Sequence, residues 1–370
     1  MVAMPPSDER TPRGRGASAD PANRFSEIVV ELDPAEVTDD DLRVPTRYLH
    51  DTSRSVISTN TSPDVGFDAS LNPYRGCEHG CAYCYARPSH EYLGLSAGLD
   101  FERTILVKAD AAALLERQLD SPRWRPRVLA LSGVTDPYQP VERRLRITRA
   151  CLEVLASYRN PVSLITKNAL VVRDIDLLAD MAAWNGARVT LSITTLDEDL
   201  RRALEPRTST LARRLDAVGQ LAAAGVPVGV NVAPIIPGLT DQDVPELLRR
   251  AADAGATHAG ITYLRLPGAV GPLFEAWLQT HAPLRKERVL NRVREGHGGS
   301  VDDRRFGRRM RGGGPYAEQV RALFRLARRR VGIPEASPPL ATDRFRRPGE
   351  AQQPALFGDD GDDGGVGGAG

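Results

Sequence analysis

The chain has 370 residues, a length that suits one large α/β domain with tails or two small domains. Hydrophobic residues make up 41% and charged residues 26%, which is the balance of a globular protein rather than a disordered or fibrous one. The net charge of +1 excludes attraction of a partner by overall charge, so electrostatic contacts must come from local patches. The polar, proline-rich start lacks the apolar stretch of a signal peptide or membrane span, and we expect a cytoplasmic protein with no membrane contact.

Apolar runs rich in β-branched residues alternate with helical patterns from residue 56 onward, whereas residues 1–55 lack sustained periodicity. The runs predicted to be strands are 103–109, 127–134, 162–167, 188–195, 226–235 and 258–266. Several of these runs are almost continuously apolar, which is typical of parallel strands that are covered on both faces.

The predicted helices lie between these strands and have recognisable ends. They span 110–120, 143–158, 174–186, 209–225 and 240–255. Ser209 is a candidate N-cap, and Gly186, Gly225 and Gly255 stand just past helix ends. Strand–helix alternation predicts a parallel α/β fold, either a barrel-like curl or an open doubly wound sheet. In both folds the chemistry lies at the carboxyl ends of the strands.

Three of the four cysteines fall within eight residues, at Cys77, Cys81 and Cys84. In a reducing compartment, clustered cysteines indicate metal or redox chemistry more often than disulfides. A structural zinc site needs a fourth ligand, for which His79 and His90 are the nearest candidates. An iron–sulfur cluster held by three thiolates leaves one iron open for another ligand.

The C-x3-C-x-aromatic-C spacing, with Tyr83 as the aromatic residue, resembles the motif of the radical S-adenosylmethionine (radical SAM) enzymes. The wider stretches NPYRGCEHGCAYCYAR (72–87), SGVTDPYQPVE (132–142) and ITTLDEDLRRALEPRTST (193–210) resemble the branch related to spore photoproduct lyase. The resemblance covers about residues 66–270 and implies a partial (β/α)6 TIM-like barrel. It also implies one [4Fe–4S] cluster on Cys77, Cys81 and Cys84, whose open iron binds SAM. Reductive cleavage of SAM, with electrons from a donor such as flavodoxin or ferredoxin, then yields a 5′-deoxyadenosyl radical that abstracts hydrogen from a substrate.

Candidate SAM contacts stand at the ends of the predicted strands. By resemblance, the loop after 127–134 receives the SAM amino group, which makes Ser132, Thr135 and Asp136 candidates. The chain has only three lysines, and Lys167 ends a strand, where an ammonium group suits the SAM carboxylate. The alternative is a lysine that extends its ammonium group to solvent from a strand end.

Later strands supply further candidates. Ser192 and Thr194 alternate with apolar neighbours and are expected to point to the barrel interior. Glu205 and Arg207 either bind the SAM ribose or carboxylate or form a helix-capping ion pair. Asn231 closes a strand before a turn that, in the resembled family, packs near the adenine and methionine parts of SAM.

The substrate is harder to predict. Spore photoproduct lyase uses a cysteine hydrogen donor on the loop after its second strand, but residues 132–140 contain none. Cys151 lies beyond that loop, on the apolar face of a predicted helix, where a small buried thiol is expected. Tyrosines could instead relay a hydrogen atom, although surface and packing roles are commoner for each of them: 85, 92, 138 and 263.

Two features point toward nucleic acid. Residues 284–330 contain 15 Lys or Arg against 5 Asp or Glu, a basic patch able to neutralise phosphates or a solvated helical face. The tail contains QPALF, and Gln353, Leu356 and Phe357 resemble the short peptide by which bacterial repair and replication proteins dock on the sliding clamp.

These features together predict a partly ordered N-terminal arm (1–55), a radical SAM core (56–283), a basic helical extension (284–332) and a disordered tail (333–370). The expected function is a lyase-like or modifying radical SAM enzyme that acts on an unknown substrate, with a nucleic-acid base in DNA repair or modification as one candidate. A radical enzyme that acts on protein or RNA has the same motifs. The alternative is a non-catalytic adaptor that bears zinc or a cluster, binds nucleic acid and docks on a sliding clamp.

Overall fold

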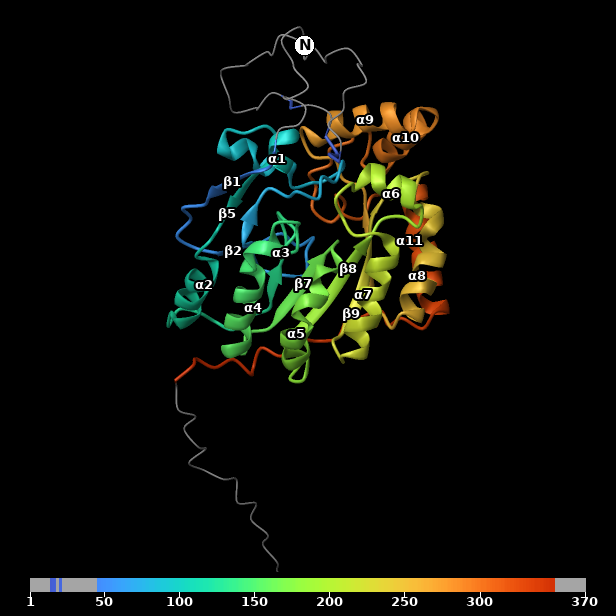
Figure 1. Cartoon of the computed structure of the whole chain (residues 1–370). Helices are drawn as coiled ribbons and strands as arrows, with labels where there is room; N and C mark the ends of the chain where they lie inside the picture. Colours follow the sequence, from blue (N-terminus) through green and yellow to red (C-terminus); the bar gives the residue numbers. More distant parts are fainter. Residues whose placement is uncertain (1–13, 18–19, 22–44, 350–370) are drawn as a thin grey trace, which may run out of the picture.

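A computed structural model describes residues 14–17, 20–21 and 45–349 of the chain (Figure 1). Its centre is an open seven-stranded sheet made of β2 (Ile57–Thr59), β3 (Ala69–Leu71), β6 (Leu129–Leu131), β7 (Val162–Thr166), β8 (Ala187–Ile193), β9 (Val228–Ile235) and β10 (His258–Tyr263). The strand order is β10-β9-β8-β7-β6-β3-β2, so six parallel strands follow one another in chain order and β2 pairs antiparallel at one edge. This is the predicted partial (β/α)6 barrel, and the expected fold class is confirmed.

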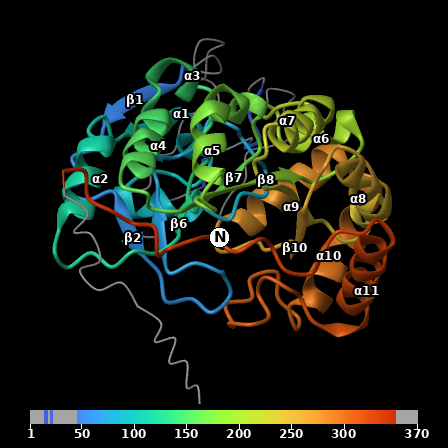
Figure 2. The same ribbon diagram turned by 90° about the horizontal axis from the view of Figure 1, so that it is seen from below.

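Amphipathic helices cover the outer face of this sheet. Figure 2 shows them in an arc: α2 (Ala111–Asp120), α4 (Ile147–Ser157), α5 (Ile175–Ala182), α7 (Leu211–Ala223), α8 (Val244–Asp253) and α11 (Gly314–Arg330). The core lies between the two layers, where Leu131, Leu164, Leu191 and Val230 of four successive strands are completely buried. Burial of such side chains is worth about 1.5–3 kcal/mol each, which holds the curled sheet against its helices.

Four further helices lie in the upper part of Figure 1: α1 (Leu99–Arg103), α6 (Glu198–Leu204), α9 (Val270–His281) and α10 (Lys286–Gly296). The short α3 (Glu142–Leu145) precedes α4. The expected basic extension thus forms α10 and α11. Helix α10 packs against α9 and α11, and α11 packs against α8 and β10.

The predicted strand 103–109 forms, but it lies outside the main sheet. It becomes β5 (Thr104–Val107), which pairs parallel with β1 (Arg47–His50) and antiparallel with β4 (Tyr74–Arg75) in a separate three-stranded sheet. The first parallel strand of the main sheet is instead β3, just before the cysteines. Because β4 leads directly into Cys77, the small sheet supports the base of the cysteine loop.

The predicted helix ends are partly confirmed. Gly225 and Gly255 have the positive φ angles of residues just past a helix end, +76° and +97°. The N-cap of α7 is Thr210 rather than Ser209, because the Thr210 hydroxyl accepts a hydrogen bond from the Arg213 amide at 3.4 Å. The Ser209 hydroxyl instead accepts from the backbone amide of Ala169 at 2.9 Å.

Two other helices end differently from the prediction. The expected helix 143–158 is broken at Arg146, whose φ of 53° separates α3 from α4. Helix α5 ends at Ala182, and Asn185 rather than Gly186 takes the left-handed conformation, with φ of 59°. Asparagine is among the side chains that tolerate this conformation, so it can replace glycine there.

The two edges of the open sheet are joined by side chains. Asp64, in the loop between β2 and β3, accepts hydrogen bonds from the Gly307 amide at 2.5 Å and from the Arg309 guanidinium. Arg309 also donates to the Ser62 hydroxyl at 2.6 Å. The segment that holds Arg309 is attached to β10, because the Tyr263 amide donates to the Met310 carbonyl at 3.0 Å.

The C-terminal part of the described chain runs back along the body. Within the expected tail, the Ala341 amide donates to the Asn185 carbonyl and the Arg346 amide to the Tyr158 carbonyl, both at 2.9 Å. The QPALF stretch with Gln353, Leu356 and Phe357 lies outside the described residues. In the part that the structure describes, none of the helices has the length and apolar character needed to cross a membrane.

Candidate functional site

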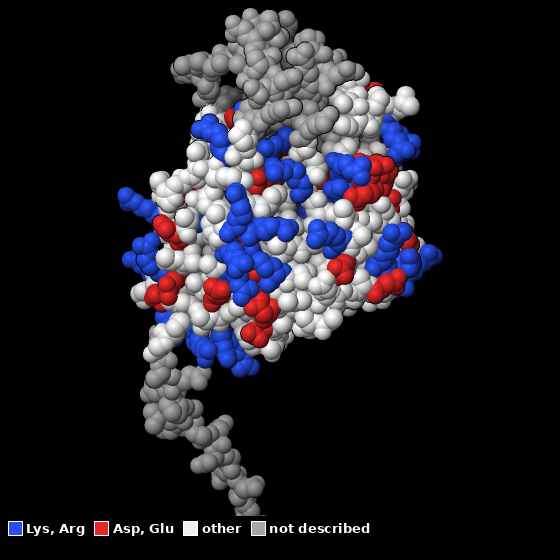
Figure 3. Space-filling model, viewed as in Figure 1, with Lys and Arg blue, Asp and Glu red and all other residues white. Residues whose placement is uncertain are grey.

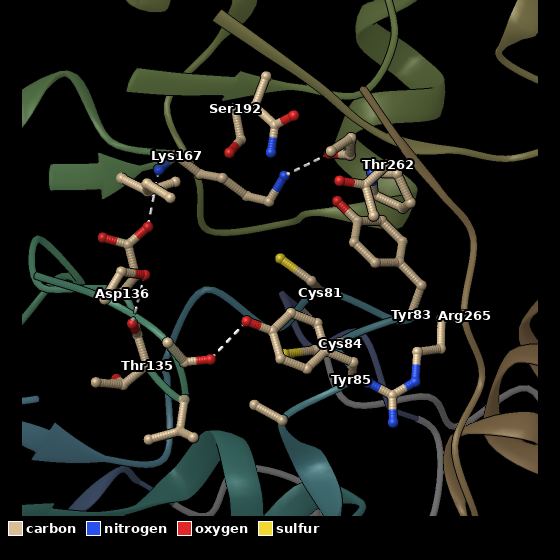
Figure 4. Close-up of a pocket in the computed structure, with 18 of the residues that line it drawn as sticks. Cys81, Tyr83, Cys84, Tyr85, Thr135, Asp136, Lys167, Ser192, Thr262 and Arg265 are labelled. Carbon is tan, nitrogen blue, oxygen red and sulfur yellow. Dashed lines mark hydrogen bonds between the residues drawn. The ribbon is translucent and has the colours of Figure 1, made fainter. Parts of the chain in front are cut away.

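The carboxyl ends of five successive strands and the cysteine loop surround one cavity of about 260 Å³ (Figure 4). The predicted residues that line it are Cys77, Cys81, Tyr83, Cys84, Ser132, Thr135, Asp136, Lys167, Ser192 and Asn231. They come from positions 77 to 231 of the chain and meet because parallel strands in chain order bring their carboxyl ends to one edge.

The cysteine loop is held mainly by backbone hydrogen bonds. The Cys77 amide donates to the Phe101 carbonyl and the Ala82 amide to the Leu204 carbonyl, both at 2.9 Å. Cys77 and Cys81 are buried and Cys84 is partly exposed. Gly76 and Gly80 have φ angles of +82° and +67°, so glycine is required where the loop turns.

A short N-terminal strap, residues 14–17, packs behind this loop. The buried Glu102 carboxylate pairs with the buried Arg87 guanidinium at 2.5 Å, and Arg87 donates to the Cys81 carbonyl at 2.9 Å. Glu102 also accepts hydrogen bonds from the backbone amides of Gly16 at 3.1 Å and Ala17 at 2.9 Å. The strap and the loop touch so closely that a Cβ atom on Gly16 would lie 1.6 Å from the Gly80 carbonyl oxygen.

The three thiols suit a metal centre in donor type and placement. Burial raises the pKa of the Cys81 thiol well above its ordinary value, and the Glu205 carboxylate raises it further. Burial also raises the pKa of Cys84 to about 11. Within the described ranges, no three His, Cys, Asp or Glu side chains are arranged to hold a single metal ion. The three soft sulfur donors on one cavity wall match the donor set of an iron–sulfur cluster.

Lys167 belongs to a buried charge network centred on Glu205. The Glu205 carboxylate, which is completely buried, lies 3.0 Å from the Lys167 ammonium and 2.6 Å from the Arg214 guanidinium. It also accepts hydrogen bonds from the Thr194 hydroxyl at 2.5 Å and from the Tyr83 hydroxyl. Burial alone would raise the pKa of Glu205, but the two cations hold it below its ordinary value.

This network leaves positive charge beside the cavity. One carboxylate is shared by two cations, Lys167 and Arg214, so the three groups sum to +1. Only Lys167 lines the cavity, and its side chain is 16% exposed. An anionic group of a bound molecule would therefore meet an ammonium group whose charge is only partly neutralised.

A buried ion pair between His79 and Asp136, which the sequence did not predict, lies at the end of β6. The His79 Nδ1 atom lies 3.3 Å from the Asp136 carboxylate. Burial would lower the pKa of His79, but Asp136 raises it to about 10. Asp136 also accepts hydrogen bonds from the Thr166 hydroxyl at 2.7 Å and the Lys167 amide at 2.8 Å, so it orders the adjacent strand end.

Three predicted residues do not line the cavity. Thr194 and Glu205 lie behind it in the Glu205 network. Arg207 lies 3.4 Å from the carboxylate of the buried Glu78, within the cysteine loop. In the described part of the chain, Glu205 and Arg207 form ion pairs with other residues and not the helix-capping pair with each other, and binding of SAM by either stays a prediction.

The other sequence candidates lie apart from the cavity or at its rim. The His90 ring, a candidate zinc ligand, contacts the Thr104 carbonyl at 2.9 Å and is absent from the cavity wall. Cys151 is completely buried in α4. Of the four tyrosines proposed as hydrogen-atom relays, Tyr85 and Tyr263 line the cavity. Tyr92 is exposed, and Tyr138 is buried with its hydroxyl 2.9 Å from the Asp174 carboxylate.

Sequence reasoning also missed part of the cavity wall, namely Thr262, Arg265 and Met310. Thr262 and Arg265 stand at the end of a predicted strand, so both positions carried a signal. Met310 carried none, because it reaches the cavity only through the packing of the loop between α10 and α11.

Positive side chains are spread over more than the predicted patch. Figure 3 shows Lys and Arg gathered over α3 and α4, where Arg143, Arg144 and Arg146 are exposed. On α8 the arginines alternate with carboxylates, as in the pair of Arg249 and Glu246 at 2.7 Å. The cluster in 284–330 is therefore one of several basic surfaces.

A partial β/α barrel with three clustered cysteines at the carboxyl ends of its strands defines a class of metal-cofactor enzymes. The family description "Radical SAM superfamily" matches residues 71–251. The chain belongs to the radical SAM superfamily and is an enzyme of that superfamily. Members of this superfamily use a [4Fe–4S] cluster with SAM.

Relatives extend this similarity. An uncharacterized protein of Mycobacterium tuberculosis is 38% identical over 231 residues, which are 62% of this chain and 67% of the relative. A protein of Pseudomonas phage M6 named radical SAM Nalpha-GlyT isomerase is 27% identical over 195 residues, 52% of this chain and 38% of that protein. Among solved structures, a spore photoproduct lyase variant superposes with a TM-score of 0.58 at 16% identity, over 77% of this chain and 79% of the other, which shows a shared fold.

Proposed function

We propose that this enzyme binds one [4Fe–4S] cluster through Cys77, Cys81 and Cys84, binds SAM beside it, and acts on a nucleic-acid substrate. The proposal is carried by one observation: the three motif cysteines and the predicted strand-end residues line a single cavity. When bound, the cluster and SAM supply a radical that abstracts hydrogen from a substrate.

Each cavity residue then has a definite task. The cysteines give up their protons on metal binding, because the thiolate is the ligand form. Lys167 offers its ammonium group to the SAM carboxylate while Glu205 holds it in place. The aromatic residue of the motif, Tyr83, ties the cysteine loop to the strand ends through its hydroxyl. Ser132 and Asn231 offer hydroxyl and amide groups to the remaining polar atoms of SAM, whereas the Thr135 hydroxyl donates to the Gly76 carbonyl at 2.7 Å and so supports the cysteine loop.

The substrate assignment is supported by the surface beside the cavity. Met310 of the basic 284–330 segment is part of the cavity wall, so its sequence neighbours Arg309 and Arg311 lie close to the cavity. Cys151 is buried in α4 and does not line the cavity, so hydrogen return from a cysteine, as in spore photoproduct lyase, is not supported here. Tyr83, Tyr85 and Tyr263 are the tyrosines that line the cavity.

The test is anaerobic reconstitution with iron and sulfide, followed by dithionite and SAM. We expect about four irons per chain and formation of 5′-deoxyadenosine, both lost in Cys77→Ala, Cys81→Ala and Cys84→Ala. The matched control is Cys151→Ala, which should keep its iron. One tightly held zinc per chain without nucleoside product would contradict the proposal and favour the adaptor.

A further inference from the structure

Arg265 is a cavity residue that has no hydrogen-bond or ion-pair partner among the described residues. It follows β10, and its side chain lines the cavity beside Tyr85 and Cys84 (Figure 4). Its Nε atom is buried and donates no hydrogen bond. Within the ranges that the structure describes, its guanidinium group takes part in no ion pair or hydrogen bond, and a buried unsatisfied charged donor costs free energy unless a ligand satisfies it.

The surroundings of Arg265 do not neutralise it. Burial lowers the pKa of Arg265 and the neighbouring Arg309 lowers it further, while Asp302, Tyr85 and Asp64 act in the opposite direction. Asp64 pairs with Arg309. Asp302 pairs with Arg304 through its Oδ2 atom at 3.2 Å, and its buried Oδ1 atom accepts no hydrogen bond from Arg265 or any other described residue. The site therefore presents a second cation to any anionic group that enters the cavity.

Lys167 and Arg265 are directed to different parts of the cavity. Figure 4 shows Lys167 and Arg265 on opposite sides of the Cys81 and Cys84 side chains. Lys167 is the cation suited to SAM. Arg265, on the rim formed by β10 and the segment after α10, is left for the substrate.

An arginine loop, residues 304–311, continues the positive charge outward from Arg265. Met310 of this loop lines the cavity, and Arg308 and Arg311 are exposed, with no side-chain hydrogen bond or ion pair in the described part of the chain. Phe306 is 60% exposed beside the Arg309 guanidinium, and Tyr85 is 51% exposed on the cavity wall. Arginines interleaved with exposed aromatic rings are typical of surfaces that bind single-stranded nucleic acid, where phosphates meet cations and bases stack.

We propose that Arg265 binds a backbone phosphate of a single-stranded nucleic acid, and that the arginine loop binds the flanking phosphates. A base next to the bound phosphate then faces the cavity, while neighbouring bases stack on Phe306 and Tyr85. An acidic polypeptide would also meet the arginines, but it gains little from the exposed aromatic rings. The inference rests on the proposed function and specifies the substrate as a strand rather than a free nucleotide.

The test measures fluorescence anisotropy of fluorescein-labelled single strands of about 12 nucleotides, a length within the range that such surfaces cover. DNA and RNA of one sequence form two arms, which identify the sugar. The proteins are the full-length wild type, Arg265→Gln, Arg265→Lys and a matched control, Arg123→Gln. Arg123 is exposed and precedes β6, at the opposite end of the strands.

We expect Arg265→Gln to bind about ten-fold more weakly and Arg265→Lys to lose less, because lysine keeps the charge but not the bidentate geometry. The slope of log affinity against log salt should fall by about 0.7 in Arg265→Gln, as for one lost phosphate contact on a single strand. Arg123→Gln should match the wild type. If Arg265→Gln fails to fold, Arg308→Gln/Arg311→Gln decides the question, because both side chains are exposed.

Unchanged affinity in Arg265→Gln, or in the loop variant when that variant decides, overturns the inference. So does equal binding of a labelled poly-glutamate of the same charge, which would make the ligand an acidic polypeptide. Binding is measured with and without reconstituted iron, so the two proposals fail separately. Iron incorporation and 5′-deoxyadenosine formation with unchanged strand binding removes only this inference. If the protein takes up no iron on reconstitution but binds the strand in a way that depends on Arg265, only the proposed radical chemistry is removed.

Discussion

Replacing Arg214 with methionine should strongly destabilise the protein, because the buried Glu205 carboxylate loses one of its two cationic partners. The Arg214 side chain is 1% exposed and donates to Glu205 at 2.6 Å and to the backbone carbonyls of Ser192 at 2.8 Å and Ser209 at 2.9 Å. Methionine fills much of the same space but donates none of these hydrogen bonds. Among the described residues, Lys167 would then be the one cation that pairs with Glu205.

The expected loss follows from these contacts. Breaking one side of a buried ion pair costs about 3–5 kcal/mol. Because Lys167 and Thr194 still contact Glu205, we expect a loss in the free energy of unfolding near the lower limit, about 3 kcal/mol. The assay is urea unfolding of the iron-free protein, followed by circular dichroism. Arg213→Met is the matched control, since Arg213 neighbours Arg214 on α7 but is exposed, and it should change stability by less than about 0.5 kcal/mol.

A second variant tests whether charge or packing causes the loss. In Arg214→Met/Glu205→Gln the carboxylate is absent, so the double variant should lose less than the sum of the two single losses. Equal stabilities of Arg214→Met and Arg213→Met would refute the reasoning. Strict additivity in the double variant would show that the ion pair itself contributes little.

Three further predictions concern other parts of the molecule. Gly16→Ala should displace the strap and at least halve the iron that the protein keeps in the presence of a chelator. The control is Gly66→Ala, because there is open space around Gly66. Equal iron retention in the two variants would contradict the role of the strap. Burial, then the charge of Arg188, lowers the pKa of the buried His258 from 6.5 to about 4. The unfolded chain therefore takes up a proton below pH 6.5 that the folded chain accepts only near pH 4. The free energy of unfolding should be retained above pH 6.5 and fall by up to about 3 kcal/mol between pH 6.5 and 4. In His258→Gln, the free energy of unfolding should depend less on pH in this range. An unchanged pH dependence would contradict the lowered pKa of His258. Lys167→Met should weaken SAM binding by about ten-fold in equilibrium dialysis, as expected for loss of a charged contact. If the variant binds SAM with wild-type affinity, Lys167 does not bind the SAM carboxylate.

The sequence predicted where strands form better than which strands pair with one another. Apolar runs located β6 to β10 to within a few residues, because burial on both faces leaves a strong pattern. The run that became β5 has the same pattern, yet it joins β1 and β4. Hydrophobicity reports that a strand is buried, but not which neighbour buries it. Strand β3, with only three residues, is too short for its pattern to stand out.

The candidate site likewise contains residues that the sequence predicted and residues that it did not. Residues that follow strands, such as Lys167 and Asn231, were predicted because parallel strands end at one edge. Arg265 stands at such an end too, but among so many arginines its residue type drew no attention. Met310 arrives from a distant loop, and the Arg87–Glu102 pair with the strap depends on tertiary packing, which no local pattern encodes.

The contact of Asp64 with Arg309 affects how wide the enzyme can open. A closed barrel has a fixed circumference, because a continuous ladder of backbone hydrogen bonds runs around it. Here the circle is completed between residues 62–64 and 307–309 by side chains and one backbone amide. These contacts can separate without breaking any strand pairing of the sheet. Asp64 makes the contacts with both Gly307 and Arg309, so this link between the two edges depends mainly on one aspartate.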